Sequence, residues 1–186
     1  RRRFGWVTFH GPMAASQSLG ALDSKQAGHL TSLLSDSQYL PSLSFPELET
    51  WYPGTAEGSL TGGCLSLIAA SLGTPYEIKT AGKILFLEEL GEPPYRIDRM
   101  LTQLILAGKL DSVTGILLGS FIDCEPAQAS YTLKECLQDI ITGLHVPVLA
   151  NFPAGHGFNN WAIPLGVKVR LNADGQSLEF LEAAVS

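Results

Sequence analysis

Two residues in this sequence combine a reactive side chain with a local setting that suits catalysis. His156 stands between Gly155 and Gly157, so the backbone can turn sharply there and leave the imidazole uncrowded. Histidine has the unperturbed pKa nearest neutrality, which suits a general base. Glu88 ends the apolar run 83–87, where a carboxylate is costly unless a partner such as histidine binds it. The alternative for His156 is a loop histidine that is hydrogen-bonded to the backbone.

An acid and a histidine need a nucleophile, and the sequence offers no clear one. The elbow pattern G-x-S-x-G is absent, and Ser59, Ser66 and Ser120 lack glycines on both sides at that spacing. Cys64 is the internal rival, because it follows two glycines and opens an apolar stretch. A thiol at a helix N-terminus can become reactive, although a buried, inert cysteine is the commoner outcome.

Further charged residues follow Glu88 along the chain. Glu89 and Glu92 are expected to be solvated acids near a helix N-terminus, where negative charge is mildly favourable, and Glu92 is also a candidate pocket acid. Arg96 or Arg99 could clamp a substrate carboxylate with two hydrogen bonds. A surface ion pair with Asp98 or a neighbouring glutamate is the alternative for these arginines.

The remaining histidines, His10, His29 and His145, are not framed by a glycine on each side and are assigned structural roles. One framed histidine and scattered acids do not give a ligand spacing such as HExxH, and no Walker-type loop is present. We therefore expect neither a metal nor a cofactor. The three cysteines contain no CxxC pair and are expected to be reduced thiols of a cytoplasmic protein.

Composition excludes several classes of function. The 186 residues are 45% hydrophobic and 16% charged, which is typical of a globular protein. The net charge of −6 argues against nucleic acid as a partner, because no basic face is present to neutralise phosphates. No apolar run approaches the roughly 20 residues of a membrane helix.

The elements that must position these side chains have an α/β pattern. Short apolar runs predict strands at 83–87, 115–118 and 146–149. Between them, apolar residues at helical spacing follow Pro94, and a Thr132–Glu135 capping box opens a second helix. Strand, helix, strand, helix, strand predicts a parallel sheet. Functional groups collect at the carboxyl ends of such strands, so Glu88 and His156 are delivered to one edge.

The ends of the chain show other patterns. Residues 4–9 read as a buried strand, and 21–34 as one helix within a segment, 17–52, that otherwise looks like a surface connection. Alternating apolar residues at 167–171 and 178–181 around a turn predict an antiparallel hairpin.

Four ordered motifs resemble the LD-carboxypeptidase family of serine peptidases. Residues 82–101 (GKILFLEELGEPPYRIDRML) are very similar to its acid-bearing segment, and residues 153–157 (PAGHG) look like its histidine loop. Residues 8–13 (TFHGPM) resemble the end of the family's N-terminal domain. Residues 62–66 followed by 73–76 resemble the start of its C-terminal domain.

The resemblance implies a fold and a division into domains. The fold is α/β, a swivelling-type β/β/α domain with a parallel βαβαβ core and a C-terminal antiparallel hairpin. Residues 1–16 would be the terminal strand of an N-terminal nucleophile domain, 17–52 a linker with a helix, and 53–186 the C-terminal domain. That nucleophile domain of the same parent protein would be its partner, and a homodimer is expected because family members often dimerise.

The resemblance also implies an activity: a Ser-His-Glu triad that removes the terminal D-Ala from murein tetrapeptides in the bacterial cytoplasm. Glu88 would orient His156, the general base, and the serine would lie outside this chain. Cys64, Glu92 and Arg96 would contact substrate, with Cys64 where an amide is expected. The alternatives are an immunity-type peptidase of the same family that acts on a peptidyl-nucleotide antibiotic, a Cys64/His156 cysteine hydrolase, and a non-catalytic module that binds wall peptides.

Overall fold

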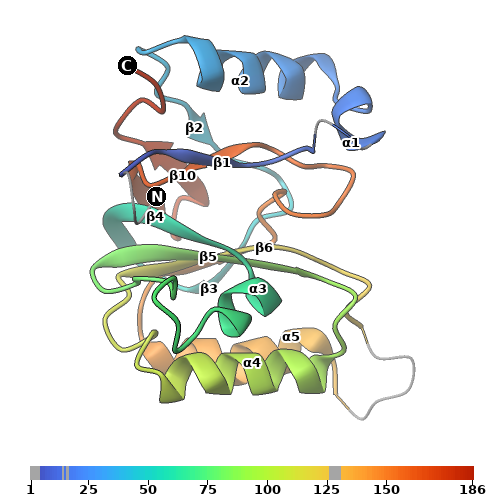
Figure 1. Cartoon of the computed structure of the whole chain (residues 1–186), viewed down its shortest axis with the longest axis vertical. Coiled ribbons are helices and arrows are strands. Elements are labelled where there is room, and N and C mark those ends of the chain that lie inside the picture. The colour runs from blue at the N-terminus through green and yellow to red at the C-terminus, as the bar shows by residue number, and fades with distance from the viewer. Residues whose placement is uncertain (1–4, 14, 16, 126–130) are drawn as a thin grey trace.

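The computed structural model describes residues 5–13, 15, 17–125 and 131–186 (Figure 1). In this part of the chain, an eight-stranded mixed sheet forms the centre of the molecule. Its strands are, in spatial order, β2 (Ser42–Leu43), β10 (Ser177–Phe180), β9 (Lys168–Asn172), β4 (Thr55–Cys64), β5 (Lys83–Leu90), β6 (Gly115–Ile122), β7 (Val148–Ala150) and β3 (Glu49–Tyr52).

The four strands β4 to β7 are parallel, and the others add to this group in antiparallel fashion. The predicted parallel core and C-terminal hairpin are confirmed by β5, β6, β7, β9 and β10. The prediction missed β4, because glycine, threonine and serine dominate it and break the apolar pattern of a buried strand. β4 ends at Cys64, beside Glu88 at the end of β5, so the two residues meet at one edge.

Three helices cover one face of the sheet (Figure 1). They are α3 (Leu65–Ala70), α4 (Pro94–Leu106) and α5 (Leu133–Ile141), the last continuing into a 3-10 turn, η1 (Thr142–Leu144). Pro94 opens α4, and the predicted capping box of Thr132 and Glu135 opens α5. The buried face of α4, with Ile97 and Leu101, packs with Leu85 and Leu87 of β5.

A second hydrophobic cluster lies on the opposite face of the sheet, and β5 contributes side chains to both clusters. Ile84 and Phe86 face this second cluster, whereas Leu85 and Leu87 face the helices. Side chains of a strand normally alternate in this way. Both faces of β5 are buried because the helices pack on one face and the second cluster packs on the other.

The segment 17–52 contributes more structure than a surface connection. It contains α1 (Gln17–Gly20) and α2 (Ser24–Ser35), and Asp23 caps α2 through a capping box. It also supplies β2 and β3, one at each edge of the sheet, so the expectation of a connection was wrong there. Strands of two and four residues lack the length for a recognisable sequence pattern. The division into domains stays a prediction.

The strand predicted at residues 4–9 is shorter and more exposed than expected. β1 (Thr8–His10) pairs antiparallel with β8 (Ile163–Leu165), and Phe4 lies outside the described residues. Trp6 and Phe9 are both exposed, so the expectation of a buried strand was wrong. Among the described residues, no helix has both the length and the apolar character that crossing a membrane requires.

Candidate active site

The alternation of β5 sends two successive carboxylates to opposite faces of the sheet. Glu88 continues the row of Ile84 and Phe86, and Glu89 continues the row that faces the helices. Both side chains are buried. A buried carboxylate needs hydrogen-bond donors, and each of the two finds a different set.

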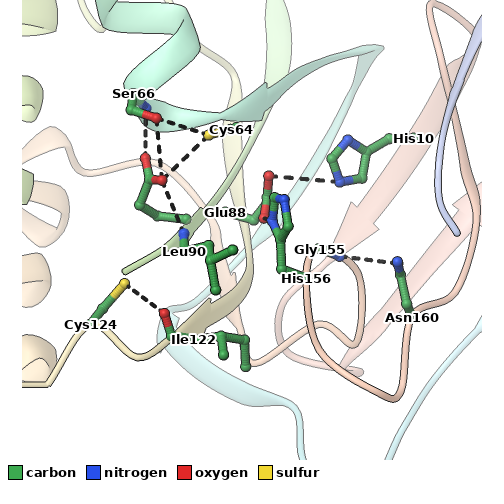
Figure 2. A network of polar contacts seen from close by, with 11 residues as sticks. His10, Cys64, Ser66, Glu88, Leu90, Ile122, Cys124, Gly155, His156 and Asn160 are labelled. Atoms are coloured by element: carbon green, nitrogen blue, oxygen red, sulfur yellow. Dashed lines mark hydrogen bonds and ion pairs between the residues drawn. The ribbon is translucent and has the colours of Figure 1, made fainter. Parts of the chain in front are cut away.

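Glu88 binds the candidate general base directly (Figure 2). Its Oε2 lies 2.8 Å from Nδ1 of His156, which sits in the loop after β7. Burial raises the pKa of Glu88, and the hydrogen bond to His156 opposes that rise. When the Glu88 carboxylate is ionised it can only accept, so Nδ1 of His156 is then the donor of this hydrogen bond. The predicted proximity of Glu88 and His156 at one edge of the sheet is confirmed.

The loop that carries His156 is held from both sides. The backbone N–H of Gly155 donates to Oδ1 of the buried Asn160, at 3.2 Å. Gly155 has φ +133°, in the region that favours glycine. Gln26 of α2 donates to Oδ1 of Asn159 at 2.8 Å, so helix α2 also restrains this loop. These contacts fix where the imidazole can reach.

His10 of β1 is a second histidine beside the acid. Its Nε2 lies 3.8 Å from Oε1 of Glu88 (Figure 2). Its ring also contacts the ring of Phe86 edge-on, with centroids 5.1 Å apart. Burial lowers the pKa of His10, and the nearby His156 lowers it further. The sequence analysis assigned His10 only a structural role. Pairing of His10 with Ile163 brings it here, and such a distant pairing leaves no local signal beyond the motif at residues 8–13.

Glu89 accepts hydrogen bonds at the start of helix α3. It accepts hydrogen bonds from the backbone N–H of Ser66 (2.6 Å), the hydroxyl of Ser66 (3.2 Å), the backbone N–H of Leu90 (3.0 Å) and the thiol of Cys64 (3.4 Å). The expectation of a solvated acid was therefore wrong. The sequence signal was available, since Glu89 shares the period-two row of Leu87.

Cys64 precedes α3, as the cysteine hypothesis required, but its environment does not activate it. Burial raises the pKa of its thiol, and the neighbouring Glu89 carboxylate raises it further, outweighing the opposing effect of Ser66. A thiolate next to a carboxylate is disfavoured. Cys64 is therefore a poor nucleophile in this setting.

A cavity of about 1030 Å³ opens over the Glu88–His156 pair. Its lining includes His10, Cys64, Gly62 and Gly63, with an apolar rim formed by the exposed side chains of Met13, Leu67, Tyr76 and Phe158. Glu92 and Arg96 do not line this cavity and pair with each other at 3.1 Å. A substrate contact by these two residues stays a prediction. Within the described residues, no cluster of three or more histidine, cysteine or acidic side chains could hold a metal.

The arrangement is a histidine bound to a buried carboxylate at the edge of a mixed α/β sheet, open to a cavity. The family model of the LD-carboxypeptidase C-terminal domain matches residues 57–171. The chain therefore belongs to the LD-carboxypeptidase family, as the sequence motifs predicted.

Relatives of known name agree with this family. The "Probable murein peptide carboxypeptidase" of Bacillus subtilis (strain 168) is 39% identical over 185 residues, which cover 98% of this chain and 58% of that protein. The crystal structure of muramoyltetrapeptide carboxypeptidase from Oxalobacter formigenes has a TM-score of 0.79 and 28% identity, and it covers 95% of this chain and 61% of that one.

The "Microcin C7 self-immunity protein MccF" of Escherichia coli is also similar. It is 28% identical over 214 residues, which cover 98% of this chain and 61% of that protein. The chain thus spans less than two thirds of the length of each of these relatives.

Proposed function

We propose that this chain supplies the acid and the base of a serine carboxypeptidase that hydrolyses the LD peptide bond to the terminal D-alanine of murein tetrapeptides. The observation that carries the proposal is the 2.8 Å contact between Glu88 Oε2 and His156 Nδ1 beneath an open cavity. The names of the related carboxypeptidases support the substrate class.

His156 acts as the general base and then as the general acid. Its Nε2 takes the proton of a serine hydroxyl while the serine oxygen bonds to the scissile carbonyl carbon. The C–N bond then breaks, the amine of D-alanine leaves with the proton from His156, and an acyl-serine remains. A water molecule, deprotonated by His156, attacks this ester and releases the serine and the shortened peptide. Glu88 holds the Nδ1–H tautomer and stabilises the imidazolium in each half of the cycle.

The serine is proposed to come from a nucleophile domain outside these 186 residues. Three observations support this assignment: no G-x-S-x-G elbow occurs in the sequence, Cys64 is not activated, and the cavity has an exposed apolar rim that a second domain could cover. The chain alone is then expected to be inactive. A homodimer and a cytoplasmic setting stay predictions from the family resemblance.

The test is to combine the chain with the nucleophile domain of its parent protein and measure D-alanine release from a murein tetrapeptide. Glu88→Ala and His156→Ala are each expected to lower kcat by at least a hundredfold with little change in KM, because both act in the transition state. Turnover that is unchanged in either variant would remove that residue from the mechanism.

An immunity-type peptidase is the second candidate, and the similarity to MccF favours it. It would use the same Glu88 and His156, so the two variants above do not separate the candidates. The substrate does: kcat/KM for a murein tetrapeptide is compared with that for a peptidyl-nucleotide. A preference of tenfold or more for the nucleotide substrate would replace the carboxypeptidase proposal.

A further inference from the structure

The Glu88 carboxylate is only half satisfied. Oε2 receives the hydrogen bond from His156, whereas Oε1 is buried and accepts none from any residue that the structure describes. A buried carboxylate oxygen without a donor is costly, and such an atom needs an explanation. Nε2 of His10, a possible donor, lies 3.8 Å from this oxygen.

We propose that His10 is a positioning residue for the catalytic acid: its Nε2–H closes onto Oε1 of Glu88 and fixes the carboxylate against His156. The inference rests on the proposed function, because it assigns a role within the same triad. It adds a residue from β1 to a site otherwise built from β5 and the loop after β7.

The required movement is small. A hydrogen bond of about 3.0 Å needs the two atoms to approach by roughly 0.8 Å, which a modest rotation of the imidazole provides. The edge-on contact with Phe86 supports the ring during this rotation, because Phe86 lies on the same face of β5 as Glu88. Burial lowers the pKa of His10, so at neutral pH the ring is uncharged and donates from one nitrogen only.

A second hydrogen-bond donor to Glu88 changes the pH at which this carboxylate takes up a proton. The groups that face or adjoin Glu88 are His10 on β1, His156 on the loop, Glu89 on β5 and Cys64 on the neighbouring strand. Glu89 disfavours the ionised form of Glu88, and His156 favours it. A hydrogen bond from His10 would favour the ionised form as well. Without the His10 donor, the Glu88–His156 pair therefore takes up its inactivating proton at higher pH.

Two substitutions separate donation from packing. His10→Phe keeps an aromatic ring against Phe86 but removes the N–H, whereas His10→Gln keeps an amide N–H at similar reach but removes the ring. The readout is the ¹³C shift of the Glu88 carboxyl carbon against pH in the 186-residue chain, with the thermal midpoint as a check on folding. This titration needs neither the serine nor turnover, so its failure is distinct from failure of the proposed function.

His10→Phe is expected to move the Glu88 titration upward by about one pH unit, the effect of one hydrogen bond to a charged group, and His10→Gln to leave it near wild type. With the nucleophile domain added, the acid limb of kcat/KM should shift in the same direction, with an activity loss of about tenfold at the acidic end. Wild-type titration in both variants, or a shift in His10→Gln alone, would overturn the proposal. The ¹⁵N shifts of wild-type His10 give a check that needs no variant, since an Nδ1–H tautomer would also overturn it.

Discussion

Gly155 lies directly against the Glu88 carboxylate. A β-carbon on Gly155 would come within 2.8 Å of Oε2 of Glu88 and 3.2 Å of its Cβ. Real β-carbons essentially never approach another atom to 2.8 Å, so any larger residue would displace the acid from the position in which it holds His156. The glycine before the histidine thus makes room for the acid, in addition to allowing the loop to turn.

Gly155→Ala is therefore expected to damage catalysis at the acid. The positive φ of Gly155 adds strain, and the combined cost should be about 1–3 kcal/mol of folding stability. A displacement of the acid by about 1 Å should lower kcat roughly a hundredfold in the assembled enzyme. Gly157→Ala is the matched control, because its β-carbon would make an ordinary 3.5 Å contact with Ser120. Equal loss in both variants would contradict the role given to Gly155.

Cys64 is expected to be dispensable for the chemical step. Cys64→Ala should keep kcat within about threefold, whereas a cysteine nucleophile would lose more than a thousandfold. A change in KM would not contradict this prediction, since Cys64 lines the cavity. Because burial raises the pKa of this thiol, iodoacetamide should label Cys64 more slowly at pH 7 than a free cysteine, as mass spectrometry can measure. Rapid labelling together with loss of kcat would restore the cysteine hypothesis.

Glu89 is expected to matter for folding through helix α3. Glu89→Ala leaves the donors of Ser66 and Leu90 without their acceptor, and the free energy of unfolding should fall by about 2 kcal/mol. Glu92→Ala is the control, since its pair with Arg96 lies in solvent and should contribute little to stability. Urea denaturation measures both. A loss no greater for Glu89→Ala than for Glu92→Ala would refute the capping role.

Glu88→Gln is expected to lose activity and to gain stability, and the gain in stability should depend on pH. Because burial raises the pKa of Glu88 in the folded chain, its contribution to stability is present at low pH and is lost as the pH rises through that pKa. A glutamine does not titrate, so the stability of the variant relative to wild type should rise between pH 4 and pH 8, while turnover collapses. Denaturation at both pH values gives the comparison. If the variant is instead less stable than wild type at pH 8, the ionised form of Glu88 does not destabilise the folded chain.

The sequence predicted that Glu88 and His156 lie together because the apolar runs before them were expected to be strands of one parallel sheet. The ends of β5 and β7 then had to meet at one edge, whatever the exact positions of the strands. Glu89 was predicted wrongly because its acidic neighbours suggest a solvated surface, whereas its position two residues after Leu87 puts it in the buried row of β5. β4 was missed because its close approach to β5 requires glycine: a β-carbon on Gly62 would fall 1.8 Å from the carbonyl oxygen of Phe86.

Long-range pairings account for the other omissions. β2 and β3 are too short to be recognised, and they are strands only because an edge of the sheet is available to each. His10 reaches the acid because β1 pairs with β8, and no local propensity encodes that pairing. Such features depend on the assembled fold, so a sequence pattern of 10 or 20 residues does not contain them.

The back-to-back placement of Glu88 and Glu89 makes β5 intolerant of changes in length. Inserting or deleting one residue within β5 would exchange the two carboxylates between faces, so Glu89 would leave the start of α3 and Glu88 would turn toward the helices. Either carboxylate could still be buried, yet neither would meet its own donors. Natural variation in this strand should therefore consist of replacements and of changes in steps of two, and engineers who graft this site should transplant the whole strand.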